Sequence, residues 1–103
     1  MLYYRLSSYV PGDGLYHVAR AFFSPGQRAQ LHGQDFAEVF WVEAGRGTHL
    51  INGRRIPLQS GDLVLMRPGD THGLVADAHD GMTFINVAMP ATPHAPAPTV
   101  LPR

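Results

Sequence analysis

The stretch THLINGRRIPL, residues 48–58, carries the clearest local signal in this chain of 103 residues. Asn52 and Gly53 stand between two runs in which apolar and polar side chains alternate. An Asn–Gly pair in that setting favours a two-residue type I′ hairpin, because both residues tolerate the positive φ angles that this turn requires. The sequence therefore predicts two antiparallel strands, residues 48–51 and 54–58, joined by a tight turn.

Short apolar segments separated by turn residues continue in both directions from this hairpin. Eleven Gly and nine Pro are spread along the chain, and turn signals recur about every ten residues, which is typical of all-β domains. No segment combines helical spacing of apolar residues with a capping residue. We expect a turn at residues 44–47 and a single-domain β-sandwich or β-barrel. Its further strands are expected at residues 2–6, 15–23, 29–32, 37–43, 63–66, 72–75 and 82–89.

The composition excludes several classes of function. The chain has no Cys, which rules out disulfides and thiol nucleophiles. Eight Arg, with no Lys, balance eight acidic residues, so a broad phosphate-binding surface is not expected. No apolar run is long enough to span a membrane, and the N-terminus has no pattern of an export signal. We therefore expect a cytoplasmic domain that handles a small molecule.

The composition changes after residue 89. Residues 90–103 contain five prolines, separated mainly by Ala and Thr. Such a segment neither fills a strand ladder nor packs a core. We interpret residues 1–89 as the domain and residues 90–103 as an extended tail or linker.

One group of polar side chains points to chemistry. Glu38 lies on the same side of its predicted strand as Phe40 and Val42, and a carboxylate among core residues needs a partner. His32 lies close to Glu38 in the sequence, and His72 begins a later strand. In a rolled sheet these side chains can converge, and imidazoles with a carboxylate are suitable ligands for a divalent transition metal. His17 alternates with apolar residues, which favours a core histidine.

Two longer patterns make the chain similar to the cupin superfamily. Residues 32–45, HGQDFAEVFWVEAG, resemble the first cupin motif, and residues 61–72, GDLVLMRPGDTH, resemble the second. The residues of these two motifs are most similar to those of the sensor domains of AraC-type bacterial regulators. Residues 84–88, FINVA, also resemble these domains. The resemblance covers residues 15–89 and implies a jelly-roll β-barrel, a double-stranded β-helix.

The resemblance also implies a site. Cupin ligands carried over by position are His32, Gln34, Glu38 and His72, with zinc, nickel, iron or manganese as the metal. The chain departs from the family pattern at Gln34, where cupins have a second His, and an amide oxygen is the weaker ligand. The alternative is a buried polar network without metal, in which Glu38 accepts hydrogen bonds from both imidazoles. We expect the ligand pocket to be lined by Phe40, His49, Met66 and Phe84.

Three functions follow as hypotheses. The first is a sensing domain that binds a sugar-like effector, as in AraC-type regulators. This chain has no helix-turn-helix half, so it is either a truncated regulator or a free-standing relative, and we expect no contact with nucleic acid or membrane. The second is a small metal-dependent enzyme of the isomerase or dioxygenase type, with the metal as Lewis acid or oxygen ligand. The third is a metal-free structural cupin that mediates dimerisation.

Trp41 suggests how copies of the chain meet. Trp41 lies an odd number of positions from Glu38 along the same predicted strand, so the two side chains point to opposite faces of the sheet. We therefore expect Trp41 on the outer face. A Trp on an outer face favours a homodimer contact. The alternative is packing beneath the N-terminal strand, against Leu2, Tyr4 and Leu6.

Overall fold

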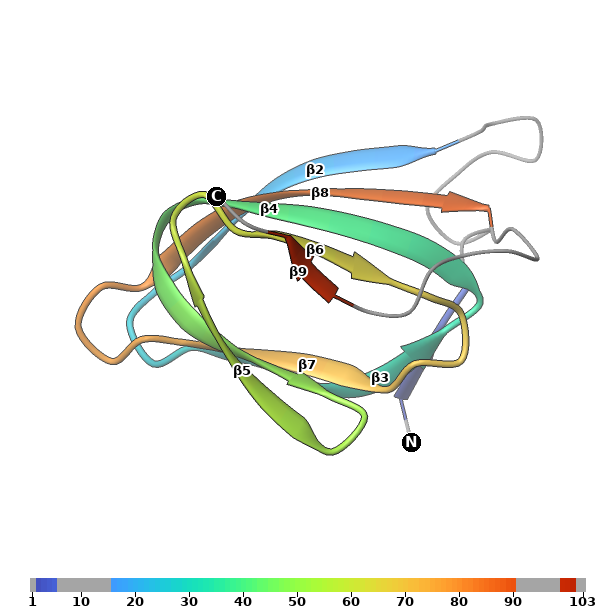
Figure 1. The fold of residues 1–103 in the computed structure, drawn as a ribbon, viewed down its shortest axis with the longest axis horizontal. Coiled ribbons are helices and arrows are strands. Elements are labelled where there is room, and N and C mark those ends of the chain that lie inside the picture. Colours follow the sequence, from blue (N-terminus) through green and yellow to red (C-terminus); the bar gives the residue numbers. More distant parts are fainter. Residues whose placement is uncertain (1, 6–15, 91–98, 102–103) are drawn as a thin grey trace.

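A computed structural model of the protein describes residues 2–5, 16–90 and 99–101. The described residues form strands and turns without a helix, as predicted (Figure 1). Within them there is also no helix long and apolar enough to cross a membrane. In chain order the strands are β1 (Leu2–Tyr4), β2 (His17–Phe23), β3 (Arg28–Gln34), β4 (Phe36–Ile51), β5 (Arg54–Gln59), β6 (Leu63–Met66), β7 (His72–Ala76), β8 (Met82–Pro90) and β9 (Thr99–Leu101).

The strands form two sheets that share β4. The first half of β4 pairs with β8 and β6, and its second half pairs with β7 and β5. One sheet, called here the β8 sheet, has the order β2-β8-β4-β6-β9. The other, the β7 sheet, has the order β1-β3-β7-β4-β5. Figure 1 shows β4 curving from one sheet into the other, which closes the jelly-roll barrel that the sequence predicted.

The turn predicted at residues 44–47 is wrong, because β4 continues through it as one strand of 16 residues. The register with β8 shifts between Val42 and Ala44, which marks a bulge. Gly45 has a φ of 81°, and the carbonyl oxygen of Gly81 occupies the space that a Cβ at Gly45 would need. The glycine therefore bends the strand from the β8 sheet into the β7 sheet.

The predicted Asn52–Gly53 hairpin is confirmed. The two residues have φ angles of 48° and 80°, and Ile51 pairs with Arg54 across the turn. Asn52 also fixes a second loop, because its side chain donates to Oδ1 of Asp70 across 3.0 Å and accepts from the Thr71 amide across 2.9 Å. This contact anchors the chain just before β7.

The core lies between the inner faces of the two sheets. Ten buried apolar side chains form one cluster: Phe40, Val42, Ile51, Leu58, Val64, Met66, Leu74, Ala76, Met82 and Phe84. Buried polar side chains gather at one end of this cluster, where His32, Gln34, Glu38, His49 and His72 are each at most 8% exposed. The apolar cluster thus forms one part of the interior, and the polar group forms another.

The two ends of the chain lie in different sheets. β1 runs parallel to β3 at the edge of the β7 sheet, with Leu2 opposite His32. The sequence left open that Trp41 packs beneath the N-terminal strand. Trp41 instead belongs to the β8 sheet, and β1 lies at the edge of the β7 sheet. Leu6, named in that alternative, lies outside the described residues. Within the Pro-rich segment, β9 pairs antiparallel with β6, so the expectation that this segment fills no strand ladder is wrong for Thr99–Leu101, which contains no proline. The division between a domain and a tail at residue 89 stays a prediction.

Candidate functional site

A cavity of about 200 Å³ opens between the two sheets beside the polar group. Both sheets contribute to its wall, which carries polar and apolar side chains. The polar or aromatic–polar ones are Tyr4, His17, His32, Glu38, His72 and Asn86, and the apolar ones are Ala19, Phe23, Ala29, Phe36, Leu74, Phe84 and Ala88. A concave, mostly apolar pocket with a few convergent polar groups is the usual form of a small-molecule site.

His32, on β3, has a defined tautomer. Its Nδ1 lies 2.8 Å from the carbonyl oxygen of Gln30, which accepts hydrogen bonds only, so Nδ1 carries the proton. In the neutral ring Nε2 is then an acceptor. The ring packs between Tyr4, at a centroid distance of 4.5 Å, and His72, at 4.2 Å. Strand β1 therefore takes part in the site through its parallel pairing with β3.

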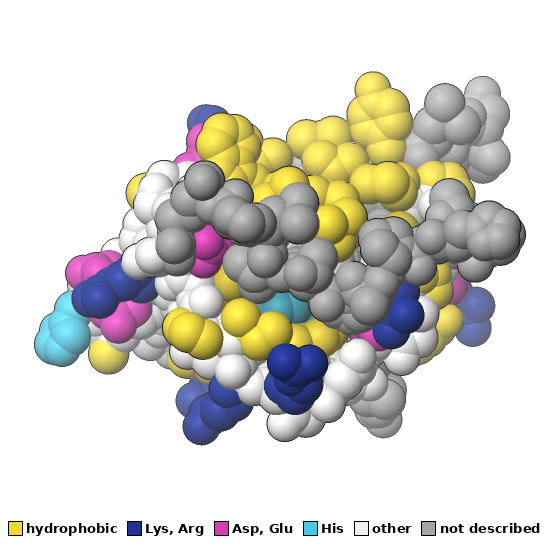
Figure 2. Space-filling view, in the orientation of Figure 1, with side chains coloured by type: hydrophobic (Ala, Val, Ile, Leu, Met, Phe, Trp, Pro, Cys, Tyr) yellow, Lys and Arg dark blue, Asp and Glu magenta, His cyan; other side chains and the backbone are white. Residues whose placement is uncertain are grey.

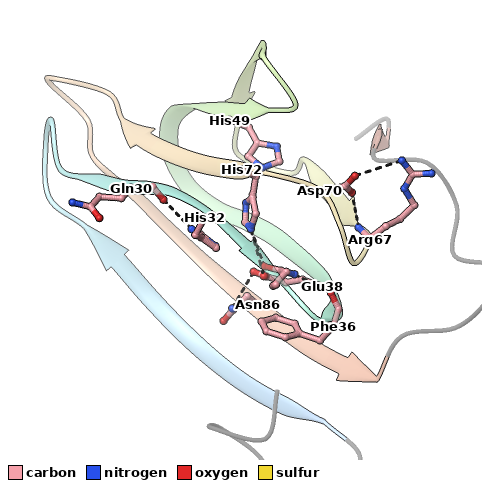
Figure 3. Close-up of polar contacts among 10 residues, drawn as sticks. Gln30, His32, Phe36, Glu38, His49, Arg67, Asp70, His72 and Asn86 are labelled. Carbon is pink, nitrogen blue, oxygen red and sulfur yellow. Dashed lines mark hydrogen bonds and ion pairs between the residues drawn. The ribbon is translucent and has the colours of Figure 1, made fainter. Parts of the chain in front are cut away.

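His72 is the centre of a hydrogen-bond chain (Figure 3). The side-chain nitrogen of Gln34 donates to the carbonyl oxygen of Phe36 across 3.1 Å, which turns the amide oxygen of Gln34 toward His72. Nε2 of His72 donates to that oxygen across 2.9 Å. Nδ1 of His72 then accepts from Nε2 of His49, across 3.2 Å. One arrangement of protons therefore satisfies the whole chain from His49 to Phe36.

His49 ends this chain without a further partner. It is 1% exposed and packs edge-on against Phe40 at a centroid distance of 5.4 Å. Its Nδ1 has no hydrogen-bond partner among the described residues. The pKa of His49 is lowered to about 4, mainly by burial; the charge of Asp70 acts upward and His32 acts downward. The pKa of His72 is lowered to about 3, mainly by burial, with His32 and His49 acting in the same direction. Both rings are therefore neutral at pH 7.

Glu38, on β4, is the acid of the site. Asn86 on β8 donates from Nδ2 to its Oε2 across 3.2 Å, and Nε2 of His72 lies 4.0 Å from its Oε1. Burial raises the pKa of Glu38, and the hydrogen bonds from Asn86 and Gln34 act in the opposite direction. Glu38 is thus a buried acceptor on the cavity wall, and its ion-pair partner among the described residues, His72, is neutral.

The four residues predicted as metal ligands do meet in the barrel, but each already has a protein partner. Gln34 bonds to His72, Glu38 accepts from Asn86, and Nδ1 of His32 donates to the carbonyl oxygen of Gln30. Both ring nitrogens of His72 already have protein partners, His49 and Gln34. In the part of the chain that the structure describes, no group of three His, Cys, Asp or Glu side chains is placed to hold a metal ion. This arrangement does not fit an ion on His72 unless Gln34 moves away. We therefore derive no chemistry through a metal, and metal binding stays a prediction.

The residues predicted to line the pocket separate into two groups. Phe84 lines the cavity, whereas Phe40 and Met66 are buried in the apolar core and His49 lies behind His72. The analysis of the sequence did not name Asn86, although Asn86 alternates with Phe84 and Ala88 along β8 and this parity places it on the same face. His17, interpreted as a core histidine, is half-buried and lines the cavity.

The sequence profile of the AraC-like ligand binding domain matches residues 15–93. The chain belongs to this family. The match includes the cavity and its polar wall, apart from Tyr4 on β1. A search of curated proteins found no match.

Solved structures share the fold at low sequence identity. A cupin protein from Bacteroides fragilis is 20% identical, with a TM-score of 0.72, and the match covers 80% of this chain and 71% of that protein. A predicted oxalate decarboxylase from Thermotoga maritima is 24% identical (TM-score 0.66; 71% and 64% covered). The polyketide cyclase RemF from Streptomyces resistomycificus is 20% identical (TM-score 0.70; 86% and 61% covered). These similarities confirm the cupin fold and assign no activity to this chain.

Proposed function

We propose that this AraC-like domain senses a small sugar-like molecule, which enters the cavity between the two sheets. Hydrogen-bond acceptors gather on one wall, where the Glu38 carboxyl group, Nε2 of His32 and the side-chain oxygen of Asn86 are available to hydroxyl donors. Phe36 and Phe84 offer apolar surface to the C–H side of the same molecule. This pairing of acceptors with aromatic surface is the observation that supports the proposal.

The size of the cavity limits the ligand. Its volume is about 200 Å³, whereas pockets for drug-sized ligands have about 300–1,000 Å³. A monosaccharide or a smaller polyol suits this space, and a nucleotide does not. The buried His72 ring is neutral at pH 7 and adds no positive charge to the wall, and the proposal is for an uncharged ligand.

A sensor must convert occupancy into a changed contact with another protein surface. The proposal therefore includes a second copy of the chain. The equal numbers of acidic and basic residues in the sequence provide no net positive charge for DNA, so this domain is proposed to respond to ligand and not to bind nucleic acid itself.

The proposal is tested with a panel of neutral pentoses and hexoses, observed by two-dimensional NMR of the labelled domain. We expect one of these sugars to shift the side-chain amide signal of Asn86 and to do so saturably. Asn86→Leu removes this amide and is expected to weaken binding about tenfold, the cost of one or two lost polar contacts. Thr83→Val is the matched control, because Thr83 lies on the same strand at a position of opposite parity.

Two results would contradict the proposal. One is a panel in which no sugar shifts any signal from the residues of the cavity wall. The other is a sugar that binds equally well to the wild-type domain and to Asn86→Leu, since that sugar would occupy a different place.

A further inference from the structure

The two outer faces of the barrel differ in chemistry. Over the β8 sheet, the side chains of Val18, Phe22 and Trp41 are each at least half exposed. Figure 2 shows hydrophobic side chains along the upper edge of the molecule, over β2 and β8, and basic side chains along its lower edge, where β5 lies. The basic side belongs to the β7 sheet, and a second hollow of the molecule lies there.

This hollow is a groove of about 570 Å³ on the outer face of the β7 sheet. The strand register places Thr48 of β4 beside Val75 of β7, and Val75 beside Arg28 of β3. Along their strands these residues alternate with side chains that face the interior, such as His49 and Leu74. The rest of the groove is formed by Gly26, Arg46, Gly47, Pro57, Leu58, Ala76, Asp77 and Ala78.

The groove is separate from the cavity inside the barrel. Leu74 and Ala29 line the cavity, whereas the next residue of β7, Val75, and the preceding residue of β3, Arg28, line the groove. The two hollows therefore lie on opposite sides of the same sheet. A ligand in one of them contacts different side chains from a ligand in the other.

Arg28 is the unbalanced charge of the groove. It is exposed, and its side chain has no ion-pair or hydrogen-bond partner among the described residues. Arg46, the other cation of the wall, donates from Nε to Oδ2 of Asp80 across 2.8 Å. The amide of Asp77 donates to the carbonyl oxygen of Arg46 across 2.9 Å, which brings a second carboxylate close to it. Arg46 is thus compensated, whereas Arg28 is free to bind a carboxylate through two parallel N–H groups.

Asp77 determines at which end of the groove an anion binds. Its Oδ2 accepts from the amides of His79 and Asp80 across 2.9 and 3.0 Å. These bonds hold the pKa of Asp77 below its ordinary value, so its carboxylate is ionised at pH 7. It repels an anion from the Arg46 end of the groove, which leaves the Arg28 end.

The row of side chains that starts at Arg28 limits the shape of the ligand. Val75 comes next and is apolar, Thr48 follows with a hydroxyl group, and Pro57 of β5 pairs with Thr48. At a strand spacing of about 4.8 Å, Arg28 and Thr48 are about 10 Å apart. A carboxylate on Arg28 thus leaves room over Val75 for an apolar body of about one ring. The volume of the groove also lies in the range of small-molecule pockets, about 300–1,000 Å³.

We propose that this groove binds a small organic acid, with its carboxylate on Arg28 and its apolar body on Val75 and Pro57. The acid is a second ligand, at a site on the other side of the sheet from the proposed sugar site. The proposal goes beyond the sensing of a sugar and does not depend on it.

Two-dimensional NMR of the labelled whole chain, titrated with cyclohexanecarboxylate, tests the proposal. We expect saturable shifts of the Thr48 amide and the Val75 methyl groups, and none of the side-chain amide of Asn86 in the cavity. Cyclohexanol lacks the charge and acetate lacks the apolar body. Each is expected to bind at least about tenfold more weakly than the acid.

One pair of variants isolates the role of Arg28. Arg28→Gln removes the charge at an exposed position and is expected to weaken the binding of cyclohexanecarboxylate at least about tenfold. Arg55→Gln is the matched control, because Arg55 is exposed on β5 of the same sheet and does not line the groove. This variant is expected to bind the acid like the wild type.

Four results would overturn the proposal. The acid shifts no signal from the groove; it shifts the Asn86 amide instead, and so occupies the cavity; cyclohexanol binds as tightly as the acid; or Arg55→Gln weakens binding as strongly as Arg28→Gln, which means a general attraction between charges. Sugar binding is observed at Asn86 and acid binding at Thr48, so the failure of one proposal is distinguished from the failure of the other.

Discussion

His72 donates a hydrogen bond from Nε2 to Oε1 of Gln34 across 2.9 Å, and this contact joins β7 to the end of β3 inside the barrel. It occupies the ring nitrogen that faces Glu38. The substitution of Gln for the second histidine of the cupin motif thus has a direct structural consequence: His72 is held by an amide as a hydrogen-bond donor.

Removal of the amide is expected to destabilise the fold. Gln34 is 1% exposed, and Gln34→Leu removes the acceptor of a buried N–H of His72 and one hydrogen bond to the carbonyl of Phe36. The free energy of unfolding is expected to fall by about 1–3 kcal/mol, the cost of such unsatisfied groups. Urea denaturation at pH 7 measures it. Gln30→Leu, at an exposed position of the same strand, is the control and is expected to change little; a Gln34→Leu protein as stable as the wild type would show that the contact contributes nothing.

Conversion of the amide to an imidazole is expected to create a better metal site. Gln34→His places three imidazoles and the Glu38 carboxylate at one end of the barrel, and imidazole binds zinc and nickel better than an amide oxygen does. We expect at least about tenfold tighter binding of Zn²⁺ or Ni²⁺ than in the wild type, measured by calorimetry. Gln30→His is the control for adventitious binding.

Elemental analysis of the wild-type protein, purified without chelator, belongs to the same experiment. About one equivalent of metal per chain would favour the alternative function of a metal-dependent enzyme, with His32, Glu38 and His72 as ligands and Gln34 displaced. Equal affinities of Gln34→His and the wild type would contradict our account of position 34.

The parts of the fold that local chemistry determines could be predicted from the sequence. The Asn52–Gly53 turn is one, because a two-residue type I′ turn requires positive φ angles and Asn and Gly adopt them at little cost. Gly45 is the opposite case. Its role as a bend depends on the carbonyl of Gly81, which is distant in the sequence. The local sequence, with glycines at 45 and 47, therefore suggested a turn. The residues of the site also fall into a predictable and an unpredictable group. The spacing of the two motifs brought His32, Glu38 and His72 together. Tyr4 reaches the site through the pairing of β1 with β3, which no local feature of the sequence indicates.

The two glycines provide a matched pair of substitutions. Gly45 and Gly53 have nearly equal φ angles, 81° and 80°, so alanine is strained to a similar extent at both. At Gly53 a Cβ meets nothing within 4 Å, whereas at Gly45 it collides with the Gly81 carbonyl. Gly53→Ala is expected to cost about 1 kcal/mol, and Gly45→Ala clearly more, because β4 and the loop at Gly81 must also move apart. Thermal unfolding of the two variants compares them, and equal losses would mean that the close approach at Gly45 is unimportant.

Acid is expected to destabilise the protein through its two buried histidines. Their pKa values in the fold, about 4 for His49 and about 3 for His72, lie below the ordinary value of 6.5. Between these limits the unfolded chain binds more protons than the folded one, so stability falls as the pH is lowered from about 6.5 toward about 4. Glu38 acts with the opposite sign: its raised pKa favours the protonated fold, and this contribution is lost as the pH rises above 4.5 through the folded pKa.

Urea denaturation across this pH range, with chelator present, separates the two effects. His49→Phe removes one of the histidine groups, and its free energy of unfolding is expected to depend less steeply on pH between about 6.5 and 4. Glu38→Gln keeps an acceptor for Asn86 and is expected to remain folded, with a smaller loss of stability toward neutral pH than the wild type. His79→Phe, at an exposed loop position, is the control and is expected to retain the wild-type profile. A profile of His49→Phe as steep as that of the wild type would show that His49 is not buried as a neutral ring.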